Sequence, residues 1–177
     1  MTFLAFSQHR RKSSSGISLV SSLRKALREY LRDRYQTDQT TRYGVIASSK
    51  FRQLGKYGVQ VSKHPFYYYG QWYQASPDDP RSCCRLEVAV SEFGCQGLEL
   101  DMPLVCWGPD LLWQENSWKT KFRKSFQVRD PHRLRLNSYR VLLTRGRDGF
   151  VVFVPLGNEF DSTYGALLTA GVSRLES

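Results

Sequence analysis

The stretch that most constrains the fold of this chain covers residues 136–155. Tyr139, Leu142 and Leu143 are spaced three and four residues apart, which predicts one apolar face of a helix. Gly146 follows as a helix-ending residue, and the apolar, β-branched run after it predicts a buried strand. The chain is therefore expected to form a helix, a tight turn and a core strand in direct succession.

Three arginines gather near the end of this predicted helix: Arg140, Arg145 and Arg147. Cations at a helix C-terminus complement the helix dipole, which is one sufficient reason for their presence. Three guanidinium groups around one turn would also form a clamp for phosphate. The residues alone leave both interpretations open.

Other apolar runs predict further strands over residues 43–50, 86–91 and 102–107. They lack alternation with polar residues, which is typical of strands covered on both faces. An apolar stripe predicts a helix over residues 17–35, and a last helix is expected around residues 164–170. These elements predict an α/β fold with a parallel sheet and right-handed crossovers.

Ser48, Ser49 and Lys50 form the end of the first of these strands. In parallel α/β sheets, ligands bind at the carboxyl ends of the strands. The three side chains are therefore predicted to meet a phosphate, such as that of a nucleic-acid backbone. Serine and lysine are also ordinary turn residues, so a purely structural role is the alternative.

The net charge of +10 favours a polyanionic partner, either nucleic acid or an anionic membrane. Residues 1–16 are predicted to form a flexible basic arm, which leaves residues 17–177 as one domain. No apolar run approaches the length of a membrane span, and no signal peptide is expected. The chain is therefore expected to be cytoplasmic, without a membrane partner.

Several other features carry weaker signals. The aromatic residues within 66–73 could stack nucleic-acid bases or pack a long loop onto the domain. Residues 111–129 are expected to form an exposed basic insertion. The four cysteines match no zinc spacing and are interpreted as reduced structural thiols, with Cys95 lying next to the residues of most functional interest.

Two segments resemble helicase motifs in the correct order. Residues 91–101, Ser-Glu-Phe-Gly-Cys-Gln-Gly-Leu-Glu-Leu-Asp, resemble the superfamily 1 motif written Thr, His and Gln-Gly-x-Glu-Phe. Residues 139–147, Tyr-Arg-Val-Leu-Leu-Thr-Arg-Gly-Arg, resemble the later motif with the core Ala-Leu-Thr-Arg-Ala. With residues 43–50 and the Asp-Pro-His at 130–132, the chain resembles the Schlafen group 3-like DNA/RNA helicase family, a bacterial domain family of unknown function.

The resemblance implies a RecA-like fold, namely the C-terminal motor half of a superfamily 1 helicase, with single-stranded DNA or RNA as partner. It implies that Arg145 is the arginine finger that reaches the γ-phosphate of ATP. It places Ser91 on the nucleic-acid face with Ser48, Ser49 and Lys50. Further nucleotide contacts implied in the same way are Gln96, Gly97, Glu99, Arg10 and Arg11.

The chain also departs from the helicase pattern. Phe93 stands where related helicases often have histidine. The 177 residues contain no Gly-x-x-x-x-Gly-Lys-Ser/Thr loop, because Gly55-Lys56 is followed by Tyr57, and no acidic magnesium motif is apparent. ATP and Mg²⁺ are therefore expected only if an N-terminal motor half supplies their site.

Three functional hypotheses remain. The chain is expected to be a truncated or split motor half that is inactive alone. The alternative is a stand-alone module that binds single-stranded nucleic acid without ATPase activity. The third is an incomplete product with no activity of its own.

Overall fold

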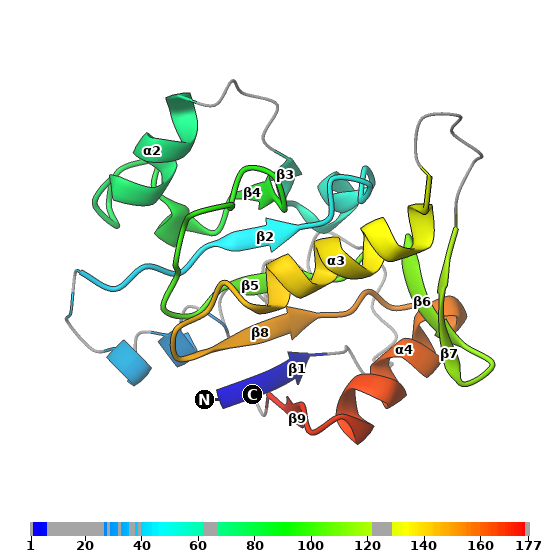
Figure 1. Cartoon of the computed structure of the whole chain (residues 1–177). Coiled ribbons are helices and arrows are strands. Elements are labelled where there is room, and N and C mark those ends of the chain that lie inside the picture. Colours follow the sequence, from blue (N-terminus) through cyan, green and yellow to red (C-terminus); the bar gives the residue numbers. More distant parts are fainter. Residues whose placement is uncertain are drawn as a thin grey trace.

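The computed structural model describes residues 2–6, 27, 29–31, 33–35, 38, 40–61, 67–121 and 129–175. Within this part, a seven-stranded sheet has the order β3-β4-β2-β5-β8-β1-β9, and all of its strand pairs are parallel (Figure 1). Its strands are β1 (Thr2–Phe6), β2 (Val45–Ala47), β3 (Gln60–Val61), β4 (Val88–Ser91), β5 (Leu104–Cys106), β8 (Gly149–Phe153) and β9 (Ser173–Arg174). The arrangement confirms the predicted RecA-like α/β class.

Both faces of the sheet are covered. Successive strand residues alternate between two apolar cores, as Val45 and Ile46 do in β2. One core joins the sheet to the helices α2 (Tyr67–Gln74), α3 (Pro131–Leu143) and α4 (Asn158–Thr169). The other core contains Leu27 and Leu31 and the short 3-10 helix η1 (Leu54–Tyr57). The uninterrupted apolar strands are explained by these two covered faces.

The helix, turn and strand at residues 136–155 form as predicted, although α3 begins earlier, at Pro131. Asp130 is its N-cap, because its carboxylate accepts from the backbone N–H of Arg133 at 2.9 Å. The Asp-Pro pair therefore starts the helix, with Pro131 in its first turn. Tyr139 and Leu142 are buried against the sheet.

The prediction of a flexible arm over residues 1–16 is wrong for residues 2–6. These residues form β1, which pairs with β8 on one side and β9 on the other. The reason is that the single strand is completed only by contacts with residues far along the chain, which local composition does not reveal. Residues 7–16 lie outside the described part.

A hairpin replaces the basic insertion expected at residues 111–129. Its strands are β6 (Leu111–Gln114) and β7 (Ser117–Thr120), and they pair antiparallel. Glu115 and Asn116 form the two-residue turn with φ of 49° and 56°, the left-handed values that such hairpins require. Leu111 is buried, so this part of the segment belongs to the core rather than to an exposed insertion. Residues 122–128 lie outside the described part.

Most of the aromatic stretch at residues 66–73 lies in α2, which covers Tyr67–Gln74. Trp72 is buried, and its Nε1 donates to the carbonyl oxygen of Val88 at 3.2 Å, so this aromatic packs onto the domain. A second 3-10 helix, η2 (Cys83–Arg85), follows. None of the helices in the described part of the chain combines the length and apolar character that a membrane span requires.

Candidate functional site

Arg145 lies in the turn between α3 and β8, at the edge of the sheet where the strands begin. Its Nε donates to the carbonyl oxygen of Val141 at 3.2 Å, and its Nη1 donates to that of Leu98 at 3.5 Å. These bonds hold the half-buried guanidinium against the end of the helix. A Cβ at the next residue, Gly146, would collide with the carbonyl oxygen of Gly149, so the turn requires glycine.

Arg147 is the more accessible arginine of this turn, with a side chain that is 54% exposed. Its Nε lies 3.2 Å from Glu99 Oε2, and its Nη1 lies 3.7 Å from Asp101 Oδ1. The hydrogen bond with Glu99, followed by the charge of Asp101, raises the pKa of Arg147. An exposed ion pair of this kind adds little stability, so a more strongly charged ligand can replace it.

A short backbone ladder joins the two motif segments. Leu100 N–H donates to Arg145 O at 2.8 Å, and Arg147 N–H donates back to Leu100 O at 2.8 Å. Asp148 N–H then donates to Asp101 O at 3.0 Å. Residues about 45 positions apart are therefore fixed beside each other, and the fold creates one surface from both motifs.

Gln96 and Gly97 are exposed in the loop that leads into this ladder, and Gly97 has a φ of 78° that favours glycine. The chain continues from Gly97 to Leu98, whose carbonyl oxygen accepts from Arg145. Arg10 and Arg11, the other nucleotide contacts implied by the resemblance, lie outside the described residues.

A buried ionic cluster of Arg135, Glu92, Asp110, Ser48 and Tyr139 lies at the opposite edge, where the strands end. Arg135 Nη1 is 3.0 Å from Glu92 Oε1, and its Nε is 3.0 Å from Asp110 Oδ2. Arg135 Nη1 also donates to Ser48 Oγ at 2.8 Å, and Ser48 Oγ donates to Asp110 Oδ2 at 2.7 Å. One guanidinium thus binds groups that follow β2, β4 and β5.

Tyr139 extends this cluster into the helix. Its hydroxyl donates to Asp110 Oδ1 at 3.0 Å and accepts from the N–H of Gly108 at 2.9 Å. Burial, and next the charge of Asp110, raises the pKa of Tyr139 well above its ordinary value. The phenol therefore stays neutral and acts as a fixed polar link between α3 and the segment after β5.

The predicted nucleic-acid contacts are not equally accessible. Ser48 is 2% exposed, and its hydroxyl is used within the buried ionic cluster, so the prediction that it meets a phosphate is corrected to a positioning role. Ser49 is half-buried, and both its N–H and its hydroxyl donate to the Glu92 carboxylate, at 2.6 and 2.9 Å. Lys50 is exposed, and Ser91 is half-buried at the end of β4.

The segment from Glu92 to Glu99 connects the two edges. It leaves β4 at the carboxyl edge and reaches the ladder beside Arg145 at the amino edge. Its middle is anchored by Cys95, which is buried and whose Sγ lies 3.7 Å from the Glu92 carbonyl oxygen. Burial raises the pKa of the Cys95 thiol to about 11, so the thiol stays protonated at neutral pH.

The residues that sequence reasoning missed are Arg135, Glu92 and Asp110. Each is a charged residue beside apolar core positions, and Arg135 precedes Tyr139 by one helical turn. That spacing was the available signal, although it does not identify the acidic partners. Among the described residues, no group of three His, Cys, Asp or Glu could hold a metal ion.

A family model described as Schlafen group 3, DNA/RNA helicase domain, matches residues 6–155. This span includes both motif loops, the hairpin and the buried ionic cluster, whereas α4 begins beyond it. No curated protein matches the chain.

Proposed function

The chain belongs to the Schlafen group 3 DNA/RNA helicase domain family, and from this premise we propose that it acts as the C-terminal RecA-like half of an ATP-dependent helicase motor. Family membership indicates a helicase-related function on nucleic acid. The observation that supports the assignment as a C-terminal motor half is the backbone ladder that fixes Arg145 and Arg147 beside Leu98–Asp101.

The chemistry of this turn fits a nucleotide phosphate. Arg145 has two of its nitrogens fixed by carbonyl oxygens, which restricts its rotation, while its Nη2 remains available within the described part. A restrained guanidinium can stabilise charge on a transferring phosphoryl group without reorganising first. Arg147 adds a second cation beside it, held by Glu99.

Another domain would have to hold ATP. The 177 residues contain no phosphate loop of the helicase type and no apparent magnesium motif, so ATP and Mg²⁺ would be bound by an N-terminal motor half. Arg145, with Gln96, Gly97 and Glu99, would then complete the site from this side. The chain alone is expected to hydrolyse no ATP.

The test is ATP turnover by the purified chain, alone and mixed with a phosphate-loop domain from a helicase of the same family. We expect turnover only in the mixture, and a loss of roughly a thousandfold on Arg145→Ala, the range for an arginine finger. Arg81→Ala is the matched control, because Arg81 is exposed and lies outside both motif segments. Turnover by the chain alone that depends on Arg145, or a mixture in which Arg145→Ala has no effect, would contradict the proposal.

A second candidate function is a stand-alone module for single-stranded nucleic acid. The observation in its favour is the placement of Lys50 and Ser91 at the carboxyl edge of a chain with a net charge of +10. This function requires strong binding of oligonucleotides without ATP or a second domain. The stand-alone function is favoured if the chain alone binds oligonucleotides strongly while addition of a phosphate-loop domain produces no ATP turnover.

A further inference from the structure

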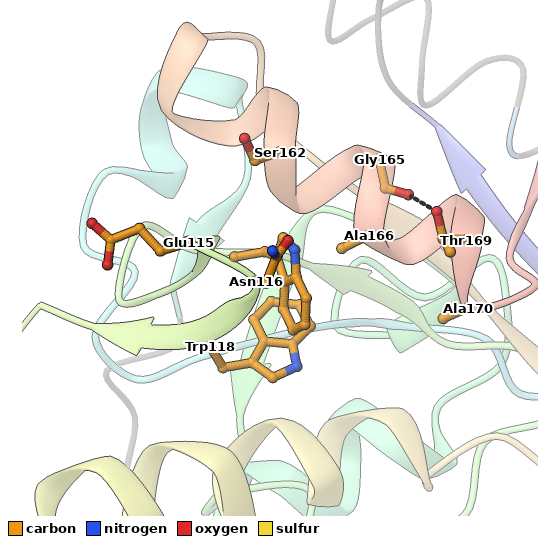
Figure 2. Close-up of a pocket in the computed structure, with 9 residues that line it drawn as sticks. Glu115, Asn116, Trp118, Ser162, Gly165, Ala166, Thr169 and Ala170 are labelled. Atoms are coloured by element: carbon orange, nitrogen blue, oxygen red, sulfur yellow. Dashed lines mark hydrogen bonds between the residues drawn. The ribbon is translucent and has the colours of Figure 1, made fainter.

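A groove lies between the β6–β7 hairpin and α4, with a volume of about 740 Å³. Its lining includes Trp113, Asn116 and Trp118 from the hairpin and Ser162, Gly165 and Ala166 from α4. Figure 2 shows Asn116 and Trp118 facing the labelled residues of α4, with Glu115 directed away from them. One wall is therefore aromatic, and the other is built from small residues.

The aromatic wall is rigid. Trp113 and Trp118 meet edge to face, with ring centroids 5.1 Å apart. Trp118 packs on the buried Trp107 at 5.3 Å, and Trp107 packs on Tyr139 at 4.4 Å. The hairpin is also fixed to α4, because the backbone N–H of Trp113 donates to Thr163 Oγ1 at 2.9 Å. Packing therefore holds both half-buried indoles in place before a ligand binds. Binding would then cost little side-chain entropy.

The α4 wall leaves room for a flat ring. A Cβ added at Gly165 would meet no heavy atom within 4 Å, so this helical glycine faces open space. Glycine inside a helix is less favourable than alanine by roughly 1 kcal/mol, and packing does not require it here. Polar groups of Asn116 and Ser162 lie at the groove, where the edge of a base could bond to them.

We propose that this groove takes a base of single-stranded nucleic acid between α4 and the indole pair, stacked on the face of one indole while the other meets it edge-on. Indole rings accept any base through its flat face, which suits a strand bound without sequence preference. The proposal rests on the proposed nucleic-acid function, but the site differs from the motif loops. One of its walls, α4, lies beyond the residues that match the helicase-domain family.

The surrounding charge complements a phosphate backbone. Lys121 follows β7, its side chain is 63% exposed, and it pairs with Glu159 in the first turn of α4. An exposed pair of this kind is weak and can be exchanged for a phosphate. The hairpin follows β5, so the groove lies toward the same edge of the sheet as Lys50 (Figure 1). A strand could therefore contact both.

Filling the groove tests the proposal directly. Binding of fluorescein-labelled oligothymidylate and of an abasic oligomer of equal length is measured by anisotropy. Gly165→Leu places a side chain in the open space and should weaken binding of oligothymidylate roughly tenfold, the scale of one lost stack. Binding of the abasic oligomer should not change. Gly70→Leu is the matched control, since Gly70 lies in α2 and also faces open space.

Tryptophan fluorescence gives a second readout that needs no variant. Trp72 and Trp107 are buried, so quenching by oligothymidylate would report on Trp113 and Trp118. We expect quenching by oligothymidylate and none by the abasic oligomer. If the chain binds oligothymidylate without quenching and Gly165→Leu binds it normally, the groove proposal is overturned while the nucleic-acid function stands. If no oligonucleotide binds at all, both are overturned.

Discussion

At the scale of single residues, the stability of the fold depends most on the buried charge of Arg135, a residue that is 1% exposed. Its guanidinium is compensated by the carboxylates of Glu92 and Asp110. Replacing Arg135 by methionine would keep much of the volume but leave two buried carboxylates without their cation. We expect the free energy of unfolding to fall by roughly 3–5 kcal/mol, measured by urea denaturation.

Arg133→Met is the control for that change, because Arg133 is exposed two positions earlier on the same helix. Its effect should stay within about 0.5 kcal/mol. Replacing Glu92 and Asp110 by their amides in the Arg135→Met protein should recover part of the loss. Equal effects of the two arginine variants would show that the buried ionic cluster does not stabilise the fold.

Tyr139 makes stability sensitive to alkaline pH. Burial, and next the charge of Asp110, raises the pKa of Tyr139 in the folded chain, whereas the unfolded value is about 10. Above pH 10 the unfolded chain releases this proton and the folded chain keeps it, so stability falls as pH rises toward the folded pKa. The contribution is at most about 1.4 kcal/mol per pH unit.

Tyr139→Phe should therefore show a flatter decline of stability between about pH 10 and 11. The measurement is urea denaturation at several alkaline pH values, and the quantity compared is the slope, not the stability at one pH. Tyr35 and Tyr57 also have raised pKa values, mainly because of burial, but they are present in both proteins. Parallel slopes would show that Tyr139 does not contribute.

The sequence predicted the roles of some of these residues and not of others. Tyr139 and Leu142 were predicted to hold the helix because their helical spacing reflects local geometry. Ser48 was predicted to contact phosphate because strand ends bind ligands, but its hydroxyl is used by Arg135 and Asp110. A buried ionic cluster depends on residues from several elements, so no single segment shows it.

At the scale of elements, the turn between α3 and β8 depends on Gly146. A Cβ there would collide with Gly149 O and would lie 2.9 Å from Pro103 Cδ. Gly146→Ala should lower the free energy of unfolding by roughly 1–3 kcal/mol, because the start of β8 would have to move. Thermal or urea unfolding measures this. Gly70→Ala in α2, where space is open, should instead raise stability by up to about 1 kcal/mol.

The elements with strong local patterns were predicted well, and those completed by distant partners were not. The apolar runs at β2, β4, β5 and β8 were recognised as strands because they are buried on both faces. The short strand β1 was missed because only its pairing with β8 and β9 makes it a strand. The hairpin was missed because its turn is Glu-Asn rather than a glycine-containing pair.

At the scale of the whole molecule, the two candidate surfaces lie at opposite edges of one sheet. Arg145 and its ladder lie where β8 begins, and Lys50 and the tryptophan groove lie toward the edge where β2 and β5 end (Figure 1). The segment from Glu92 to Glu99 joins the edges, with its first carboxylate in the buried ionic cluster and its last beside Arg147. A strand bound at one edge and a nucleotide bound at the other would therefore contact the same segment.

The net charge of +10 predicts that binding of single-stranded oligonucleotides weakens steeply with salt, and Lys50 tests whether this attraction is localised. Lys50→Ala should weaken binding and reduce the slope of log affinity against log salt by about 0.7, the value for one lost phosphate contact on a single strand. Arg81→Ala removes the same charge from a side chain that is 61% exposed and paired with Asp79. Fluorescence anisotropy at several salt concentrations should show a smaller slope for Lys50→Ala only. Equal changes in both variants would mean that the whole charge attracts the strand and that the carboxyl edge is not its binding face.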